Sequence, residues 1–374
     1  MIFYCESRIF SGQERMFLTA ACAISNNEDC ELIINKNNSQ GIEFSKRNGA
    51  FSKVVLLDDF NEKYSSLLVW FRWKYIYKVV KILKGSKDIF CVSQGRIESG
   101  NVGVLAAKIV GLKVISYIPM VHSHKEMTGS GIINRMKDLL CRLLYSLPNI
   151  FITISPAVST ALSKISSKKI YVVENFVQQR TISKSSNTLA RINDGSYKIV
   201  IPGRLLNKQK GQLDFINAFE EIRCKTGKDI VCYIIGDGPD RGIIEHEVTK
   251  RSLTNSIYIL GNRNDLPNIM SCCDLIVLPS RFEGVPLVLL EAAQLNKKIV
   301  ASDIVGFNDY LPKEYLFNPL NIDSIAKCVA KNINNESETV KYNKELIDLL
   351  NRNEDIFKND FLNVINLIKK EYDC

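Results

Sequence analysis

Short runs of β-branched and aromatic residues alternate along the chain with longer stretches in which apolar residues recur at helical spacing. Such runs occupy residues 1–5, 31–35, 53–57, 88–92, 113–118, 150–154 and 169–173 in the first half, and residues 198–202, 229–236, 256–260, 274–280 and 298–302 in the second. Helical stretches lie between several of them, at residues 13–23, 67–83, 101–110 and 132–144. Strands that alternate with helices indicate βα units, so the sequence predicts an α/β protein with mainly parallel sheets.

A polar segment separates the two halves of this pattern. Residues 178–198 are rich in Ser and Asn, a composition typical of a linker. A chain of 374 residues also exceeds what one hydrophobic core usually serves. The sequence therefore predicts two domains, at residues 1–185 and 196–354. The tail, residues 355–374, carries a one-sided apolar stripe and is expected to form a helix, for which packing back on the first domain is one option.

The composition is that of a soluble globular protein, with 46% hydrophobic and 24% charged residues. No apolar run reaches the roughly 18 residues that a membrane span needs. The first ten residues also lack the basic leader and long apolar stretch of a signal peptide. We therefore expect neither an integral membrane protein nor a secreted one.

The 11 cysteines are scattered, apart from the neighbours Cys272 and Cys273, and no Cys-x-x-Cys spacing occurs. Most lie inside apolar runs, where a free thiol behaves as a small buried hydrophobe. This pattern predicts free thiols, no metal site and a reducing, cytoplasmic compartment.

Positive charge is concentrated in the first half of the chain. Residues 1–200 contain 27 Lys and Arg against 15 Asp and Glu, a net charge of +12, whereas residues 201–374 carry a net charge of −3. A basic half suits an anionic partner, which could be nucleic acid, a membrane surface or a phosphorylated substrate. A solubilising surface without a partner is the alternative.

The segment 67–84 combines both tryptophans of the chain with a row of lysines. At helical spacing one face is apolar (Val69, Trp73, Ile76, Val80 and Leu83) and the other is basic (Lys74, Lys78, Lys81 and Lys84). Trp70 lies near the lysines, and an aromatic ring among lysines suits the surface of an anionic bilayer. The segment predicts peripheral membrane binding; the alternative is an ordinary helix that covers the sheet.

A loop early in the second half places two cations at the end of a strand. Gly203, Arg204 and Lys210 lie between the strand at 198–202 and a following helix, at the edge where open α/β sheets bind ligands. A guanidinium and an ammonium beside flexible backbone suit a pyrophosphate. An ordinary basic loop is the alternative.

Two further turns follow strands in the same half. Gly236, Gly238 and Pro239 lead from strand to helix, with Pro239 expected at the first helical position. The glycine spacing is G-x-G-x-x-x-G and no acid follows about twenty residues later, so this turn does not match an NAD site. Asn262 and Arg263 follow the strand at 256–260. The backbone there either contacts the edge of a nucleotide base or forms an ordinary turn.

The segment 280–293 is the most informative. A strand leads into a loop with Glu283, Gly284 and Val285, and Pro286 is expected to begin a helix. Unpaired N–H groups at a helix start form an anion site. Glu283 and Glu291 flank that start. Because carboxylates repel phosphate, the pair is better explained as accepting hydrogen bonds from sugar hydroxyls on either side of a pyrophosphate.

With EGVPLVLLE at 283–291 and its E-x7-E spacing, together with GRLLNKQKG, GDGP and CDLIVLPS, the chain resembles the family-4 retaining glycosyltransferases. The resemblance spans most of residues 198–306. It implies the GT-B fold, in which two Rossmann-like parallel-sheet domains face a central cleft. The first domain would bind the acceptor and the second the nucleotide-sugar donor.

The resemblance also implies roles for single residues. Arg204 and Lys210 hold the donor diphosphate, Glu283 lies against the donor sugar, and Glu291 binds the ribose hydroxyls. The other candidate donor contacts are Gly12, Gly203, Gly236, Gly238, Pro239, Asn262, Arg263, Gly284, Val285 and Pro286. A histidine after the strand at 113–118 faces the donor sugar, His122 by preference and His124 otherwise. No metal or cofactor is implied, and the donor is of the UDP or GDP type.

The resemblance thus implies a metal-independent, retaining hexosyltransferase that moves a sugar to a hydroxyl of a lipid-linked or oligosaccharide acceptor. The expected setting is the biosynthesis of a surface polysaccharide, such as lipopolysaccharide or capsule, at the cytoplasmic leaflet. Two alternatives stay open. One is a non-hydrolysing sugar-nucleotide epimerase or another GT-B enzyme. The other is a nucleic-acid binder that uses the basic first half, although no recognised reading module accompanies it.

Overall fold

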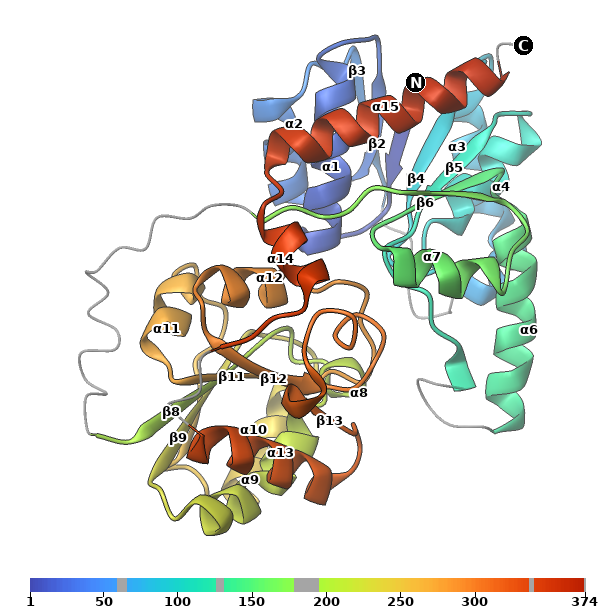
Figure 1. Cartoon of the computed structure of the whole chain (residues 1–374). Coiled ribbons are helices and arrows are strands. Elements are labelled where there is room, and N and C mark those ends of the chain that lie inside the picture. The colour runs from blue at the N-terminus through green and yellow to red at the C-terminus, as the bar shows by residue number, and fades with distance from the viewer. Residues whose placement is uncertain (59–65, 126–130, 178–194, 336–339, 373–374) are drawn as a thin grey trace. The chain divides into compact units, whose positions relative to one another are not determined.

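The structure is a computed structural model that describes residues 1–58, 66–125, 131–177, 195–335 and 340–372. The chain forms two compact units (Figure 1). Unit 1 comprises Met1–Asn175 and Glu354–Cys374, and unit 2 comprises Phe176–Asn353. Most of the linker predicted at 178–198 lies outside the described residues.

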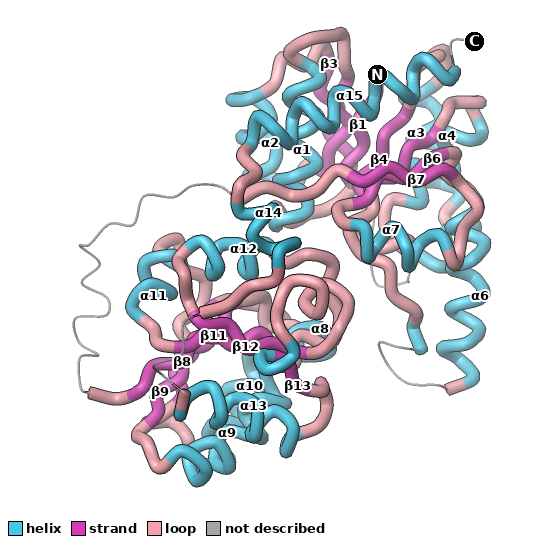
Figure 2. The backbone as a smooth tube through the Cα atoms, viewed as in Figure 1, coloured by secondary structure: helices cyan, strands magenta, loops and turns pink. Residues whose placement is uncertain are grey.

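Unit 1 is built on a seven-stranded parallel sheet. Its strands are β1 (Ile2–Cys5), β2 (Glu31–Asn35), β3 (Lys53–Leu57), β4 (Phe90–Ser93), β5 (Val114–Tyr117), β6 (Ile150–Thr153) and β7 (Lys169–Val172). They are hydrogen-bonded in the order β3-β2-β1-β4-β5-β6-β7. Figure 2 shows the strands in magenta. Every strand predicted in the first half is found. The order reverses between β1 and β4, which places the ligand crevice of a doubly wound sheet at their carboxyl ends.

The helices of unit 1 lie between these strands in the chain. They are α1 (Gly12–Ser25), α2 (Ser39–Asn48), the 3-10 helix η1 (Ser66–Phe71), α3 (Trp73–Leu83), α4 (Asn101–Ile109), α6 (Ile132–Ser146) and α7 (Pro156–Ser163). Strands β1, β4, β5 and β6 are buried along their whole length. Continuous apolar runs are expected of parallel strands that helices cover on both faces.

The last helix, α15 (Glu354–Tyr372), belongs to unit 1 and packs against α1. Its apolar stripe is buried, as the residues Phe357, Phe361, Val364, Ile365 and Ile368 show. The rings of Phe361 and of Tyr117 at the end of β5 lie 6.1 Å apart. An ion pair between Lys369 and Glu28 joins the far end of α15 to the loop after α1. Burial of this stripe therefore holds the end of the chain on unit 1.

Unit 2 repeats the plan with a six-stranded parallel sheet. Its strands are β8 (Tyr197–Pro202), β9 (Ile230–Ile235), β10 (Ile257–Ile259), β11 (Leu275–Leu278), β12 (Lys298–Ser302) and the short β13 (Leu316–Phe317), in the order β10-β9-β8-β11-β12-β13. Its helices are α8 (Asn207–Lys210), α9 (Gln212–Thr226), α10 (Arg241–Lys250), α11 (Leu266–Cys272), α12 (Leu287–Gln294), the 3-10 helix η3 (Lys313–Tyr315), α13 (Ile322–Asn334) and α14 (Lys344–Leu350). Among the described strands of unit 2, only β13 was not predicted.

The prediction of one continuous helix over residues 67–83 is wrong. Residues 66–71 form the 3-10 helix η1, and the non-helical Arg72 (φ −94°, ψ 32°) separates it from α3. A 3-10 helix has three residues per turn instead of 3.6. The apolar and basic faces that were assigned by α-helical spacing from Val69 therefore do not continue into α3. Trp73 is 64% exposed, whereas Ile76, Val79 and Leu83 are buried. Trp73 therefore joins the lysines on the outer face.

The ten described cysteines are free thiols, and seven of them are buried. Burial raises the pKa of the Cys22, Cys141 and Cys273 thiols to about 12. They are therefore protonated near neutral pH and are poor nucleophiles. The prediction of free, mostly buried thiols is confirmed for these ten residues.

Candidate active site

Four loops meet at the carboxyl edge of the unit 2 sheet, after β8, β9, β11 and β12. They pack backbone against backbone at glycines. A Cβ atom added to Gly236 would lie 2.0 Å from the carbonyl oxygen of Gly203, and one added to Gly306 would lie 1.9 Å from that of Gly284. A Cβ atom added to Gly238 would lie 2.3 Å from the carbonyl oxygen of Leu205. These motif glycines therefore serve first to let neighbouring loops approach one another.

Hydrogen bonds along the backbone join the first two of these loops. The N–H of Gly203 donates to Ile235 (2.8 Å), and the N–H of Leu205 donates to Asp237 (3.0 Å). The side chain of Gln212, which is buried, donates to the carbonyl of Arg204 (2.9 Å). The backbone of Arg204 is thus fixed while its side chain is exposed at the sheet edge. This is the placement that binding of an anionic ligand needs.

The ammonium of Lys210 and the carboxylate of Glu283 form an ion pair at this edge. Lys210 ends the short helix α8, Glu283 lies in the loop between β11 and α12, and their Nζ and Oε1 atoms are 2.5 Å apart. Glu283 is buried and the Lys210 side chain is mostly so. The structure therefore brings together two predicted site residues that lie 73 positions apart in the chain.

A second ion pair, which sequence reasoning missed, anchors the Glu283 loop. The Arg281 guanidinium donates to both carboxylate oxygens of Asp214 in α9, each at 2.8 Å. The N–H of Arg281 also donates to the carbonyl of Gln209 (2.7 Å). These bonds tie the loop to α8 and α9, and so fix Glu283 opposite Lys210. The position of Arg281 two residues before Glu283 was the only sequence signal.

Breaking this anchor gives the first testable result. Replacing Arg281 by alanine leaves Asp214 without its forked partner, and we expect the free energy of unfolding to fall by about 1–3 kcal/mol. Urea unfolding measures this effect. The control is Arg241→Ala, which breaks an exposed 2.8 Å pair with Glu245 and should cost under about 1 kcal/mol. Equal effects from both variants would refute the anchoring role.

Helix α12 begins one residue later than predicted. Pro286 is its N-cap (φ −68°, ψ 129°) and Leu287 its first residue, because an extended Pro286 follows the buried Val285. Gly284 and Val285 precede the cap, so their backbone leads up to the helix start. Glu291 lies in the second turn and is partly buried. The two acids flank the helix start as predicted.

The turn after β9 also differs from the prediction. Pro239 is not the first residue of α10, which starts at Arg241 after the N-cap Asp240. The reason is that Asp240 is hydrogen-bonded to the segment that follows β8. Its N–H donates to the carbonyl of Leu205 (3.1 Å), and its carboxylate accepts from the N–H of Asn207 (2.7 Å). The GDGP segment therefore supports the loop that carries Arg204 and Lys210.

The loop after β10 holds the candidates Asn262 and Arg263. The carbonyl of Gly261 accepts from the N–H of Gly236 (2.9 Å), and Asn262 is exposed. The Arg263 guanidinium donates to both carboxylate oxygens of Asp265, each at 2.8 Å. Its charge is thus compensated locally. Contact of this loop with a base stays a prediction.

In unit 1 the candidate Gly12 is the first residue of α1, after β1. Ser11 and Glu14 form a capping box at this helix start. The Gln13 side chain donates to the Ser93 hydroxyl at the end of β4 (3.0 Å). The glycine loop therefore lies at the reversal of strand order between β1 and β4, where a ligand is expected.

The two histidines after β5 differ in their surroundings. The imidazole of His124 is buried, and its Nε2 lies 2.6 Å from Oε1 of Glu98. The N–H of His124 also donates to Asp138 in α6 (2.5 Å). His122 is only partly buried. His124 is thus bonded within unit 1, and the orientation of either histidine towards a donor sugar stays a prediction.

Glu98, His124 and Cys141 each offer a donor atom, all within 4.8 Å of one another. Two ligands of one tetrahedral zinc ion lie about 3.3 Å apart, given metal–ligand distances near 2 Å. The Nε2 of His124 and Oε1 of Glu98 lie only 2.6 Å apart, closer than that separation. The described cluster is therefore a close imidazole–carboxylate pair beside a thiol that burial keeps protonated.

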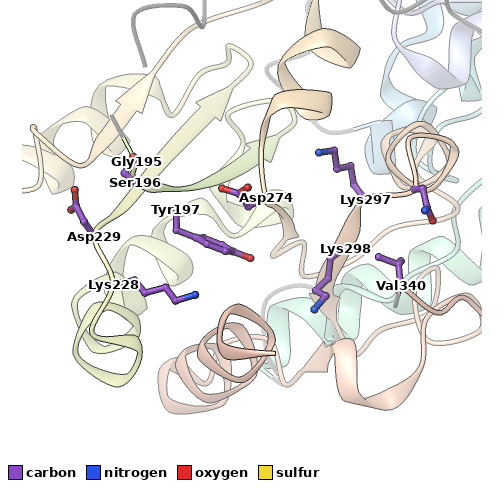
Figure 3. A pocket seen from close by; sticks show the side chains of 10 residues that line it. Gly195, Ser196, Tyr197, Lys228, Asp229, Asp274, Lys297, Lys298 and Val340 are labelled. Carbon is purple, nitrogen blue, oxygen red and sulfur yellow. The ribbon is translucent and has the colours of Figure 1, made fainter. Parts of the chain in front are cut away.

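A cavity of about 760 Å³ lies at the opposite, amino edge of the unit 2 sheet (Figure 3). Its lining includes Tyr197, Lys228 and Lys298, but none of the predicted site residues. The Lys228 ammonium lies 5.3 Å from the centre of the Tyr197 ring, and Lys298 donates to the carbonyl of Asn335 (2.6 Å). These cations are already bonded within the protein, so the cavity is not part of the candidate site.

Residues 187–347 match the family model for glycosyl transferases group 1. The chain is 27% identical over 213 residues to UDP-Gal:alpha-D-GlcNAc-diphosphoundecaprenol alpha-1,3-galactosyltransferase of Escherichia coli, covering 54% of this chain and 52% of that protein. It is 20% identical over 296 residues to poly(ribitol-phosphate) alpha-N-acetylglucosaminyltransferase of Staphylococcus aureus (strain COL), covering 77% and 56%. The chain thus spans about half the length of these curated relatives.

Among solved structures, HepE of Anabaena in complex with UDP-glucose matches with a TM-score of 0.73 and 16% identity, over 98% of this chain and 99% of that chain. At this identity the likeness shows the fold. The predicted α/β fold of the GT-B type, with two Rossmann-like units, and the resemblance to glycosyltransferases are therefore confirmed. The assignment to family 4 and the roles of single site residues stay predictions.

Proposed function

We propose, with the match to glycosyl transferases group 1 as the premise, that this chain moves a hexose from a nucleotide-diphosphate sugar to an acceptor hydroxyl. The observation that carries the proposal is the buried Lys210–Glu283 pair, which lies beside the start of α12 at the carboxyl edge of the unit 2 sheet. Arg204 is exposed at the same edge. A donor held there meets cations at its diphosphate and an acid at its sugar.

In the proposed reaction, the bond between the anomeric carbon and the donor diphosphate breaks. The acceptor oxygen bonds to that carbon on the same face, and its proton passes to the leaving phosphate. Arg204, Lys210 and the N–H groups at the start of α12 stabilise the charge that develops on the leaving group. No metal is required for this step. The retained configuration is part of the proposal.

We propose a UDP-sugar as the donor and a lipid-linked saccharide as the acceptor. HepE is described in complex with UDP-glucose, and the E. coli relative is named for UDP-Gal and an acceptor on diphosphoundecaprenol. A lipid-linked acceptor would place the enzyme at the cytoplasmic leaflet in surface polysaccharide synthesis. The net charge of +12 over residues 1–200 suits an anionic bilayer there.

The full chain should be assayed with UDP-, GDP- and ADP-hexoses, with and without a lipid-diphosphate saccharide. The proposal expects sugar transfer that depends on the acceptor and persists in EDTA. Conversion of the sugar nucleotide without any acceptor would instead establish an epimerase. Binding of RNA without any nucleotide binding would favour the nucleic-acid alternative.

The ribose contact can be tested by replacing Glu291 with alanine. If Glu291 accepts hydrogen bonds from ribose hydroxyls, UDP binding should weaken by about 1–3 kcal/mol. Isothermal titration measures the change. Glu220→Ala, which removes an exposed glutamate of α9, is the control and should leave UDP binding unchanged. Unchanged affinity in the Glu291 variant would remove this residue from the site.

A further inference from the structure

Helix α6 of unit 1 carries a row of large apolar side chains on its outer surface. Their exposed fractions are 77% for Ile132, 63% for Met136, 62% for Leu139 and 53% for Leu143. Steps of four, three and four residues place these side chains in one line along the helix. Single exposed apolar residues are normal, but a continuous row indicates a surface that something covers.

The same helix is held to unit 1 by a different face. Cys141, Leu144 and Tyr145 are buried, and they belong to the core of unit 1 or pack on it. Helix α6 is therefore apolar on two sides, although one side is enough to attach it. Among the described residues, those that attach α6 to the core of unit 1 lie on the other side of the helix from this row.

The charges around the row have one sign. Arg135 and Arg142 are exposed and lie along one of its edges. The acid of the helix, Asp138, is partly buried and accepts from the backbone N–H groups of His124 and Lys125. A partner thus meets an apolar row with arginines beside it. This combination suits the headgroup boundary of an anionic bilayer.

Exposed aromatic side chains lie on η1, which is next to α6, and on α3, which follows it in the chain. Helix α6 packs against η1, where Trp70 and Phe71 are exposed, and η1 leads directly to α3. On α3, the exposed Trp73 and Tyr77 lie under the ammonium groups of Lys74 and Lys81 respectively. Tryptophan and tyrosine rings with lysines are typical of the lipid headgroup region. Among the described helices, none has the length and apolarity required to cross a bilayer.

We propose that the row Ile132, Met136, Leu139 and Leu143 inserts into the headgroup boundary of an anionic bilayer. Trp70 and Phe71 enter beside it, and the lysines of α3 supply attraction to the lipid charge. The sequence pattern assigned membrane binding to residues 67–84 alone, whereas the structure assigns insertion to α6. The inference rests on the proposed function, because a lipid-linked acceptor would be presented on that surface.

The full chain should be mixed with phosphatidylcholine vesicles, with and without phosphatidylglycerol, and sedimented. Combining Ile132→Ser, Met136→Ser and Leu139→Ser should weaken binding to the anionic vesicles by at least about tenfold, at low and at high salt. Combining Lys74→Gln and Lys81→Gln should remove mainly the part of the binding that salt weakens. Ile109→Ser on α4, where the side chain is 65% exposed, is the control and should bind as the unaltered chain does.

Fluorescence gives a second readout, because Trp70 and Trp73 are the two tryptophans of the chain. Their emission should shift to the blue on anionic vesicles, and brominated lipid should quench it. The α6 triple variant should lose both effects. Unchanged vesicle binding by that variant would overturn the proposal. So would a change of its oligomeric state with vesicle binding intact, since a second copy would then cover the row.

Transfer to a water-soluble acceptor separates this inference from the proposed function. The α6 triple variant should transfer sugar to such an acceptor at the rate of the unaltered chain, since α6 carries none of the proposed donor contacts. Vesicle binding without any transferase activity would defeat the proposed function and leave the docking surface standing. Transferase activity without vesicle binding would defeat the docking surface and leave the proposed function standing.

Discussion

Replacing Lys210 by alanine is expected to lower kcat/KM by about 10²–10³-fold, because in the proposed reaction the leaving diphosphate loses one of its two cations in a partly buried site. Initial rates at several concentrations of the sugar nucleotide measure this change. Lys208→Ala is the matched control, since Lys208 lies in the same short helix but is exposed. If both variants kept the same activity, Lys210 would have no role in the reaction.

The ion pair with Glu283 allows a sharper form of this experiment. Removing Lys210 alone takes the neighbouring positive charge away from the buried Glu283 carboxylate, which is expected to cost about 3–5 kcal/mol of stability. Combining Lys210→Ala with Glu283→Gln removes both charges, so most of that stability should return while activity should not. Recovery of activity together with stability would show that the pair is structural.

Replacing Gly306 by alanine is also expected to lower stability strongly. The added Cβ would lie 1.9 Å from the carbonyl oxygen of Gly284, and φ at Gly306 is +102°, where side chains are strained. The clash and the strain together should lower the unfolding free energy by about 2–5 kcal/mol. Thermal unfolding measures this effect, and UDP binding should weaken because the Gly284 backbone must move.

Gly242→Ala is the control for this prediction. Gly242 lies in α10, nothing lies within 4 Å of its added Cβ, and its φ is ordinary. In a helix, alanine is favoured over glycine, so this variant should keep or raise stability by up to about 1 kcal/mol. If Gly306→Ala matched it, the close approach of the two loops would not hold in solution.

The strands were predictable because parallel strands that helices cover on both faces appear in the sequence as short apolar runs. Each of the runs became a strand, from β1 to β12, and only the two-residue β13 left no signal. The order of strands in each sheet was not predictable from these runs. Strand β8, for example, pairs with β9 and with β11, which is third after it in the chain.

The buried side of a helix was less predictable from the sequence than the presence of the helix. The sequence placed Trp73 on the buried side of its helix, but the break at Arg72 turns it outward. In α6 the pattern shows apolar residues on both sides and cannot say which side packs. Leu144 is buried and Leu143 is exposed only because of where the core of unit 1 lies.

The sequence by itself determined the two α/β units and the residue types of the proposed donor site, since the glycines, cations and acids stand in short segments at strand ends. Only the tertiary structure decided which of these groups touch. Lys210 meets Glu283, and Arg281 meets Asp214, because β8 lies beside β11 and brings their carboxyl ends together. The physical reason is that local patterns encode burial and turn geometry, whereas contacts between distant segments follow from the packing of the whole sheet.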